Sequence, residues 1–121
     1  MGSARDVVER YYDAFDRKDP VWKDMVSSDV RFQAPLEQAT NAEEFREITE
    51  RFLQFHESTR VRARFEDGDQ VCSFLEFDLT TPAGGAMSCL VSELATVKDG
   101  RLAEVEIVYD PRAFAEAFGL S

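Results

Sequence analysis

The sequence has little of what metal, redox and phosphate-binding sites are usually built from. Its 121 residues include two cysteines, Cys72 and Cys89, and one histidine, His56. No Cys-x-x-Cys or His-x-x-x-His spacing, phosphate-binding glycine loop or Gly-x-Ser-x-Gly motif occurs. We therefore expect no metal and no cofactor, and we interpret both cysteines as reduced, small hydrophobic residues.

Positive charge and long apolar runs are also scarce. The chain has 14 Lys and Arg residues against 24 Asp and Glu, a net charge of -10. Nucleic-acid backbones and anionic membrane surfaces repel such a chain, so we expect neither as a partner. No apolar run approaches the roughly 18 residues of a membrane span, and the N-terminus does not resemble a secretory signal. The expected location is therefore cytoplasmic.

What is present predicts one α+β domain over residues 1–121. Hydrophobic residues make up 44% of the chain and include ten Phe, enough for one core rich in large flat side chains. Helical spacing and capping residues precede a run of alternating strands with turns near residues 68, 84 and 99, an order typical of helices packed on one sheet face. The expected elements are helices over 3–18, 20–26 and 41–55, a strand over 30–34, four long strands, and a last short helix opened by Asp110-Pro111.

The long strands alternate, so that odd positions form one apolar face. Glu93 is the only charged residue at these odd positions, between Val91 and Ala95. A buried carboxyl must be protonated or hydrogen-bonded, and a neutral one can donate a hydrogen bond to an oxyanion. The alternative is a Glu held for structural reasons by a backbone group or a Tyr hydroxyl.

Tyr11 is the second candidate for a catalytic residue. Its ring belongs to the apolar stripe of the first helix, and its hydroxyl needs a partner inside, either Glu93 or a backbone carbonyl. We predict that Tyr11 and Glu93 form a hydrogen-bonded pair at the bottom of a pocket. The residues expected to line that pocket are Phe15, Trp22, Met25, Phe32, Phe52, Phe77, Val91, Tyr109 and Phe114, although simple packing is the alternative for Trp22 and Met25.

Even positions predict the outer surface of the sheet. Arg60, Arg62 and Arg64 stand opposite Glu76 and Asp78, which indicates cross-strand ion pairs. His56 follows a helix end and is expected at the surface or in a cap. The outer face also carries Phe74, Leu90, Leu94, Leu102 and Val108 among Ser88, Ser92 and Thr96, a mixture typical of a two-fold interface, so we expect a homodimer.

Three stretches carry a resemblance to a known family. They are Val7-Val8-Glu9-Arg10-Tyr11, the run from Ser92 to Leu102, and Val108-Tyr109-Asp110-Pro111. In this order and spacing the chain resembles the nuclear transport factor 2-like superfamily, including ketosteroid isomerases and SnoaL-like polyketide cyclases, from Arg5 to Phe118. The resemblance implies a cystatin-like fold, a curved antiparallel sheet wrapped around N-terminal helices to form a cone-shaped pocket.

The resemblance also implies roles for site residues. It places the oxyanion-holding Tyr of ketosteroid isomerases at Tyr11, their protonated acid at Glu93 and their general base at Ala34. Alanine cannot move a proton, and Glu37 is the nearest substitute. Three functions stay open: an isomerase or cyclase acting on an enolisable polyketide or steroid-like carbonyl, a non-catalytic module that binds a hydrophobic molecule, and a dimeric interaction domain whose cavity is filled.

Overall fold

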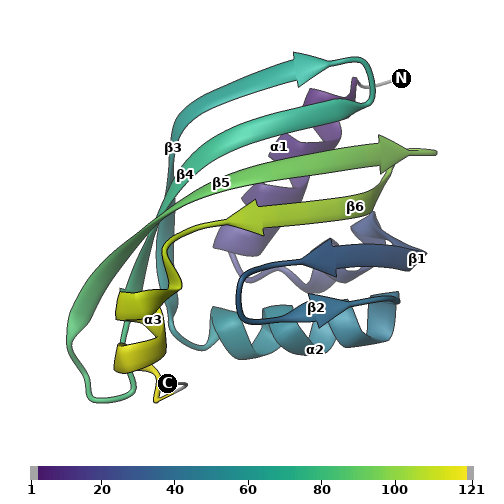
Figure 1. Ribbon diagram of the computed structural model, residues 1–121. Coiled ribbons are helices and arrows are strands. Elements are labelled where there is room, and N and C mark those ends of the chain that lie inside the picture. The colour runs from purple at the N-terminus through teal and green to yellow at the C-terminus, as the bar shows by residue number, and fades with distance from the viewer. Residues whose placement is uncertain (1–2, 120–121) are drawn as a thin grey trace.

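The computed structural model describes residues 3–119, so the two ends of the predicted domain, 1–2 and 120–121, lie outside the described residues. It confirms the α+β class: an open, curled sheet of six strands in the order β2-β1-β6-β5-β4-β3, antiparallel except where β1 meets β6. α1 lies against the concave side of the long strands (Figure 1). The elements are α1 (Ala4–Asp16), a 3-10 helix (Pro20–Met25), β1 (Val26–Gln33), β2 (Gln38–Ala39), α2 (Ala42–Leu53), β3 (His56–Asp67), β4 (Gln70–Thr80), β5 (Ala86–Lys98), β6 (Arg101–Val108) and α3 (Pro111–Ala117).

The helices begin at the residues whose side chains can cap them. Ser3 and Asp6 form a capping box at the start of α1, and Asn41 accepts a hydrogen bond from the Glu44 backbone at the start of α2. Asp110 caps α3 in front of Pro111, as the sequence predicts. Among residues 3–119, no helix is both long and apolar enough to cross a bilayer.

The register of the central strands confirms the predicted apolar face. Val71 pairs with Ala95, and Leu75 with Val91, so odd positions of β4 meet odd positions of β5 and all four side chains are buried. Burying each such side chain contributes about 1.5–3 kcal/mol of hydrophobic free energy. Glu93 lies on this face as predicted, but its neighbours across the sheet are Ser73 and Ile107.

β3 departs from the predicted alternation because its pairing with β4 shifts twice. The shifts fall between His56 and Ser58 and between Val61 and Ala63, and each adds one residue to β3. Beyond the second shift, even positions of β3 face inward, so Arg64 pairs with Ser73 on the inner face and Phe65 is exposed. The predicted outward Arg64 and inward Phe65 are therefore wrong.

His56 owes its place to the first of these shifts. It pairs with Leu79 and is fully buried, so its predicted position at the surface or in a cap is wrong. Its Nε2 lies 2.8 Å from the Thr59 hydroxyl, while the ring packs among Phe15, Phe52 and Phe77. Burial lowers the pKa of His56, so the ring stays neutral at physiological pH and behaves as part of the aromatic core.

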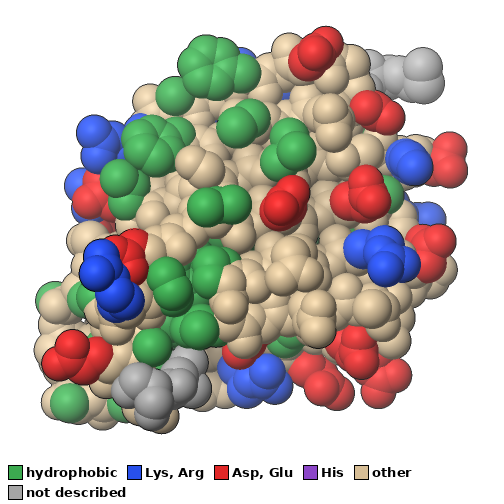
Figure 2. All heavy atoms as spheres, in the orientation of Figure 1, with side chains coloured by type: hydrophobic (Ala, Val, Ile, Leu, Met, Phe, Trp, Pro, Cys, Tyr) green, Lys and Arg blue, Asp and Glu red, His purple; other side chains and the backbone are tan. Residues whose placement is uncertain are grey.

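The pairing of β5 with β6 shifts between Thr96 and Val97. Because of this shift, one residue predicted on the outer surface lies on the inner side of the sheet. Leu102 pairs with Val97 and is buried on the inner side, not exposed. The other apolar side chains on the outer face are exposed to solvent. Figure 2 shows hydrophobic side chains gathered over the long strands between groups of charges. We call this set the outer patch; its exposed fractions run from 38% to 69%, and its members are Phe65, Phe74, Leu90, Leu94 and Val108.

Charged side chains flank the outer patch on both sides. On the β3 side, Arg60 and Arg62 form ion pairs with Glu76, and Arg60 also with Asp78, as predicted. On the β6 side, Glu104 and Glu106 alternate with the inward residues. The face therefore has an apolar centre and a charged rim, the composition that suits an interface between two copies of the chain.

We accordingly propose that a second copy of the chain covers the outer patch. Sedimentation equilibrium at tens of micromolar should give a dimer, because exposed apolar area of this kind is usually covered. Leu94→Glu should give a monomer, since it buries a carboxylate in the interface. Val21→Glu, an equally apolar and exposed position on the 3-10 helix, is the matched control and should stay dimeric. A monomeric wild-type protein would contradict the proposal.

Candidate functional site

A cavity of about 330 Å³ opens between the inner face of the sheet and the helices. Its wall is mostly aromatic and aliphatic, with a buried polar end near α1 and an exposed end near α3. Such a space suits a small, largely apolar molecule. Seven of the nine residues predicted to bind a ligand contribute to the wall: Phe15, Phe32, Phe52, Phe77, Val91, Tyr109 and Phe114.

The other two predicted lining residues lie elsewhere. Trp22 is buried behind α1, with its ring edge-on to that of Tyr11 at 6.4 Å between centroids. Met25 packs against the core from the end of the 3-10 helix. Both fill space behind the first helix, so their predicted place in the pocket wall is wrong and the packing alternative holds.

Glu93 and a tyrosine form the polar end of the cavity. The Glu93 side chain projects from β5, and the residue is only 4% exposed. The hydroxyl of Tyr12 donates a hydrogen bond to Glu93 Oε2. The predicted hydrogen bond from Tyr11 is therefore wrong by one residue.

The direction of α1 explains why Tyr12 and not Tyr11 reaches Glu93. Both tyrosines are buried and line the cavity. Tyr12 leans towards the sheet, 6.4 Å from the ring of Phe77, while Tyr11 faces Trp22 and the hydroxyl of Thr49 on α2. The spacing Val8–Tyr12–Phe15 follows one face of a helix, so the sequence did contain the signal for Tyr12.

A cation also lies on the inner face, next to the carboxyl. The residues Arg64, Ser73 and Glu93 form a row across β3, β4 and β5. Arg64 Nε donates to Ser73 Oγ at 2.8 Å, and the guanidinium lies over the Tyr12 ring at 5.8 Å from the centroid. Sequence parity predicted no inward Lys, Arg or His near Glu93, and the second shift in β3 overturns that prediction.

Burial dominates the protonation of the site. Desolvation raises the pKa of Glu93 to about 7, although the hydrogen bond from Tyr12 and the charge of Arg64 oppose the rise. Desolvation, followed by repulsion from the Glu93 charge, also raises the pKa of the Tyr11 and Tyr12 hydroxyls. Both tyrosines therefore remain donors at neutral pH, while Glu93 is able to gain or lose a proton there.

The position predicted for a general base lines the same cavity. Ala34 is buried in the wall and its backbone N–H donates to the Glu37 carbonyl at 2.9 Å. The Glu37 side chain lies at the exposed end, where it forms a long ion pair of 3.8 Å with Arg51. Sequence reasoning missed Thr49 and Arg51 as wall residues. In the described part of the chain, no three His, Cys, Asp or Glu side chains are placed to hold a metal ion.

The environment of Glu93 generates a prediction for the free protein. In a carbon-13 NMR titration of the side-chain carboxyls, the Glu93 resonance should have a midpoint near a pKa of about 7. Exposed glutamates should titrate near ~4.3. A Glu93 midpoint in that lower range would show that the carboxyl is hydrated and would remove it from the site.

The same pKa shift predicts how stability depends on pH. The folded state holds the Glu93 proton while the unfolded chain releases it near pH 4.5, so the free energy of unfolding should fall as pH rises from 4.5 to about 7. The loss is on the order of 3 kcal/mol. Glu93→Gln should remove this part of the pH dependence at little cost, because it keeps a neutral donor and acceptor.

Chemical denaturation across this pH range measures the effect, with Glu93→Ala as the comparison. The alanine variant should cost about 1–3 kcal/mol, because it leaves a void and a Tyr12 hydroxyl without its acceptor. Parallel pH profiles for wild type and Glu93→Gln would contradict the assignment.

Comparisons with known proteins identify the fold. A protein of unknown function from Cytophaga hutchinsonii, described as NTF2-like, superposes with a TM-score of 0.81 at 21% identity, over 94% of this chain and 96% of that one. A protein from Jannaschia sp. CCS1, assigned provisionally to the SnoaL-like polyketide cyclases, gives 0.81 at 16%, over 98% and 92%. TerC, co-crystallised with polyporic acid, gives 0.80 at 19%, over 94% and 96%.

No curated protein matches the sequence. The family model of the SnoaL-like domain matches residues 8–105, which includes most of α1, strands β1 to β5, the first part of β6 and the Tyr12–Glu93 pair. The match spans most of the chain, and the chain therefore belongs to the SnoaL-like domain family within the NTF2-like superfamily, which confirms the predicted resemblance.

Proposed function

We propose that this protein binds a small, largely apolar carbonyl or phenolic compound in its cavity and that Glu93 hydrogen-bonds the oxygen of that compound. The observation that carries the proposal is the buried Glu93 carboxyl at the closed end of a mostly apolar wall. A buried polar group in that position destabilises the fold unless it has hydrogen-bond partners in the protein or in a bound ligand. The one hydrogen bond from Tyr12 leaves a protonated carboxyl with a donor to spare.

The direction of that hydrogen bond indicates how a ligand would be held. Because Tyr12 donates to Oε2, a protonated Glu93 carries its own proton on Oε1. That proton is available to a carbonyl, enol or phenol oxygen, and the Tyr12 hydroxyl strengthens it as a donor. The aromatic side chains of the wall, among them Phe15, Phe52 and Phe77, supply flat contact surfaces for an unsaturated or ring-containing body.

The comparison with TerC supplies a probe of this ligand class. That protein was co-crystallised with polyporic acid, and its fold matches this one over nearly the full chain. At 19% identity the match carries the fold alone, so polyporic acid serves as one probe among several. An open cavity favours a ligand-binding function over an interaction domain whose cavity is filled.

A thermal-shift screen with hydrophobic phenols and ketones, with polyporic acid included, tests the proposal. Compounds that bind should raise the melting temperature of the wild-type protein, because they bind the folded state alone. Tyr12→Phe and Glu93→Ala should each weaken binding about tenfold, which corresponds to one hydrogen bond of roughly 1.4 kcal/mol. Tyr109→Phe, which alters a hydroxyl away from the polar end, is the matched control and should bind as wild type. Binding that ignores both Tyr12 and Glu93 would contradict the proposal.

Catalysis of the isomerase or cyclase kind is the second candidate, and the titration of Glu93 near neutral pH favours it. A carboxyl with a pKa of about 7 can give and take a proton at physiological pH. Ala34 lines the same cavity and has no group that moves a proton. A reaction that needs a second proton carrier would therefore have to use Glu37 or the ligand itself.

Replacing Ala34 tests this candidate directly. We expect no appreciable isomerisation of a β,γ-unsaturated ketosteroid by the wild-type protein, and measurable isomerisation by Ala34→Asp, because the new carboxylate faces the same cavity as Glu93. Absorbance of the conjugated product reports the rate. Ala34→Asn is the isosteric control and should stay inactive. Rapid turnover by the wild-type protein would show that another residue is the base.

A further inference from the structure

The Arg64 side chain is unusually buried for an arginine on an edge strand. Its side chain is only 5% exposed, although β3 is an edge strand and the neighbouring Arg60 and Arg62 point to solvent. Nε is held by Ser73, but Nη2 is buried and has no hydrogen-bond partner within residues 3–119. A buried guanidinium with an unpaired donor and little countercharge is costly, so a further negative charge nearby in some functional state is expected.

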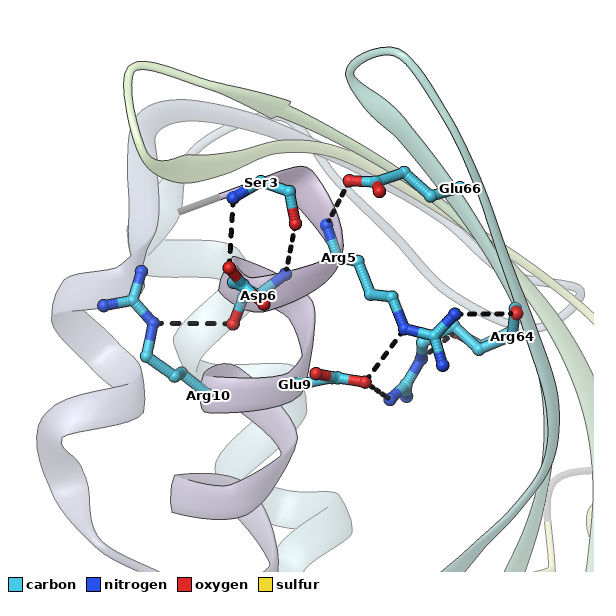
Figure 3. Close-up of polar contacts among 8 residues, drawn as sticks. Ser3, Arg5, Asp6, Glu9, Arg10, Arg64 and Glu66 are labelled. Carbon is cyan, nitrogen blue, oxygen red and sulfur yellow. Dashed lines mark hydrogen bonds and ion pairs between the residues drawn. The ribbon is translucent and has the colours of Figure 1, made fainter. Parts of the chain in front are cut away.

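The countercharge of Arg64 is weak and shared. Glu9 on α1 approaches Arg64 Nη1 at 3.9 Å, and the same carboxylate oxygen accepts a hydrogen bond from Arg5 Nε at 3.0 Å. Figure 3 shows Arg5 and Arg64 converging on Glu9 from two sides. The Glu9 side chain is 45% exposed, and water screens it. Much of the positive charge of Arg64 therefore acts towards the interior.

Arg64 is the single cation among the described residues that pack around Glu93. α1 contributes the hydroxyls of Tyr11 and Tyr12, and α2 contributes Thr49 behind Tyr11. Ser73 lies beside Glu93 on β4, and Ile107 lies beside it on β6. Arg64 follows next in the row on β3, with its guanidinium over the Tyr12 ring.

We infer that Arg64 is a positioning residue that makes the closed end of the cavity select a ligand bound as an ionised enol or phenol. The inference rests on the proposed function, since it concerns the charge of the same ligand oxygen. With Glu93 neutral, the closed end carries the charge of Arg64 and a carboxylic O–H, a combination that favours an oxyanion. With Glu93 ionised, the carboxylate offsets Arg64 and repels the ligand.

Binding should then be coupled to one proton. The ionised ligand enters without its proton, and Glu93, when ionised, takes one proton from solvent to become the donor. The proton leaves a buffer acid, whose bond to hydrogen breaks, and forms the O–H bond of the Glu93 carboxyl; no other covalent bond changes, and the charges of the ligand and the proton sum to zero. Arg64 acts through Tyr12 and Glu93 in this scheme and does not touch the ligand.

Isothermal titration calorimetry with 4-hydroxycoumarin, an acidic enol, and coumarin, which lacks the hydroxyl, tests the inference. Measurements slightly above neutral pH in two buffers of different ionisation enthalpy count the protons. The wild-type protein should prefer 4-hydroxycoumarin and take up protons with it, up to one per site, but none with coumarin. At about pH 6, where Glu93 is protonated in both proteins, Arg64→Met should lose about tenfold in affinity for 4-hydroxycoumarin, equivalent to about one unit of pKa, and none for coumarin. Arg64→Lys should recover most of the loss.

A titration of the free protein separates the two proposals. In Arg64→Met the carbon-13 midpoint of Glu93 should rise by about one pH unit, because an adjacent cation lowers a carboxyl pKa by that order. Arg64→Lys should titrate as wild type. If neither compound binds the wild-type protein, the proposed function and its ligand fail together. If both bind, and Arg64→Met keeps the wild-type preference or the wild-type Glu93 midpoint, the inference about Arg64 alone is overturned.

Discussion

Placing the Glu93 carboxyl in an apolar cavity is the constraint on which the site depends. A carboxyl that loses its water costs several kcal/mol unless it is protonated or has hydrogen-bond partners. α1 therefore has to present a hydroxyl at one depth and one angle, which Tyr12 does. On the sheet, the inward neighbour of Glu93 on β4 is the small, polar Ser73, which leaves room for the carboxyl. The protonation of Glu93 follows from this packing and not from any charge that the sequence places next to it along the chain.

The cavity itself follows from the bend of the long strands. β3, β4, β5 and β6 curve around α1, while α2 and α3 lie towards the far end of the bend (Figure 1). Aromatic rings line the space and pack against one another, as in the edge-to-face pair Phe52 and Phe77 at 5.2 Å between centroids. Large rigid rings packed edge to face keep a cavity of defined shape open between them. Flexible aliphatic side chains in the same positions would fill that cavity.

Most of the fold could be predicted from residue patterns. Caps at Asp19, Asn41 and Asp110, together with period-two alternation in β4 and β5, place the elements and put Glu93 inside. The errors share one physical origin, because a one-residue shift in strand pairing turns every later side chain to the other face. Such shifts moved His56, Arg64 and Leu102 inward. Helical spacing from Val8 to Phe15 fits Tyr11 and Tyr12 equally, and both are buried on α1; the crossing angle of the helix on the sheet directs Tyr12 to Glu93.

The shifts in β3 also bear on how the sheet ends. A long edge strand offers a row of free N–H and C=O groups to any passing strand, and this is a common route to aggregation. Two added residues in β3 bend it and break the regular spacing of those groups, while Arg60 and Arg62 place charges along it. The opposite edge, β2, has only two residues. Neither edge is a good template for a strand of another chain, so the irregularity that turns Arg64 inward also protects the protein from growing into a fibre.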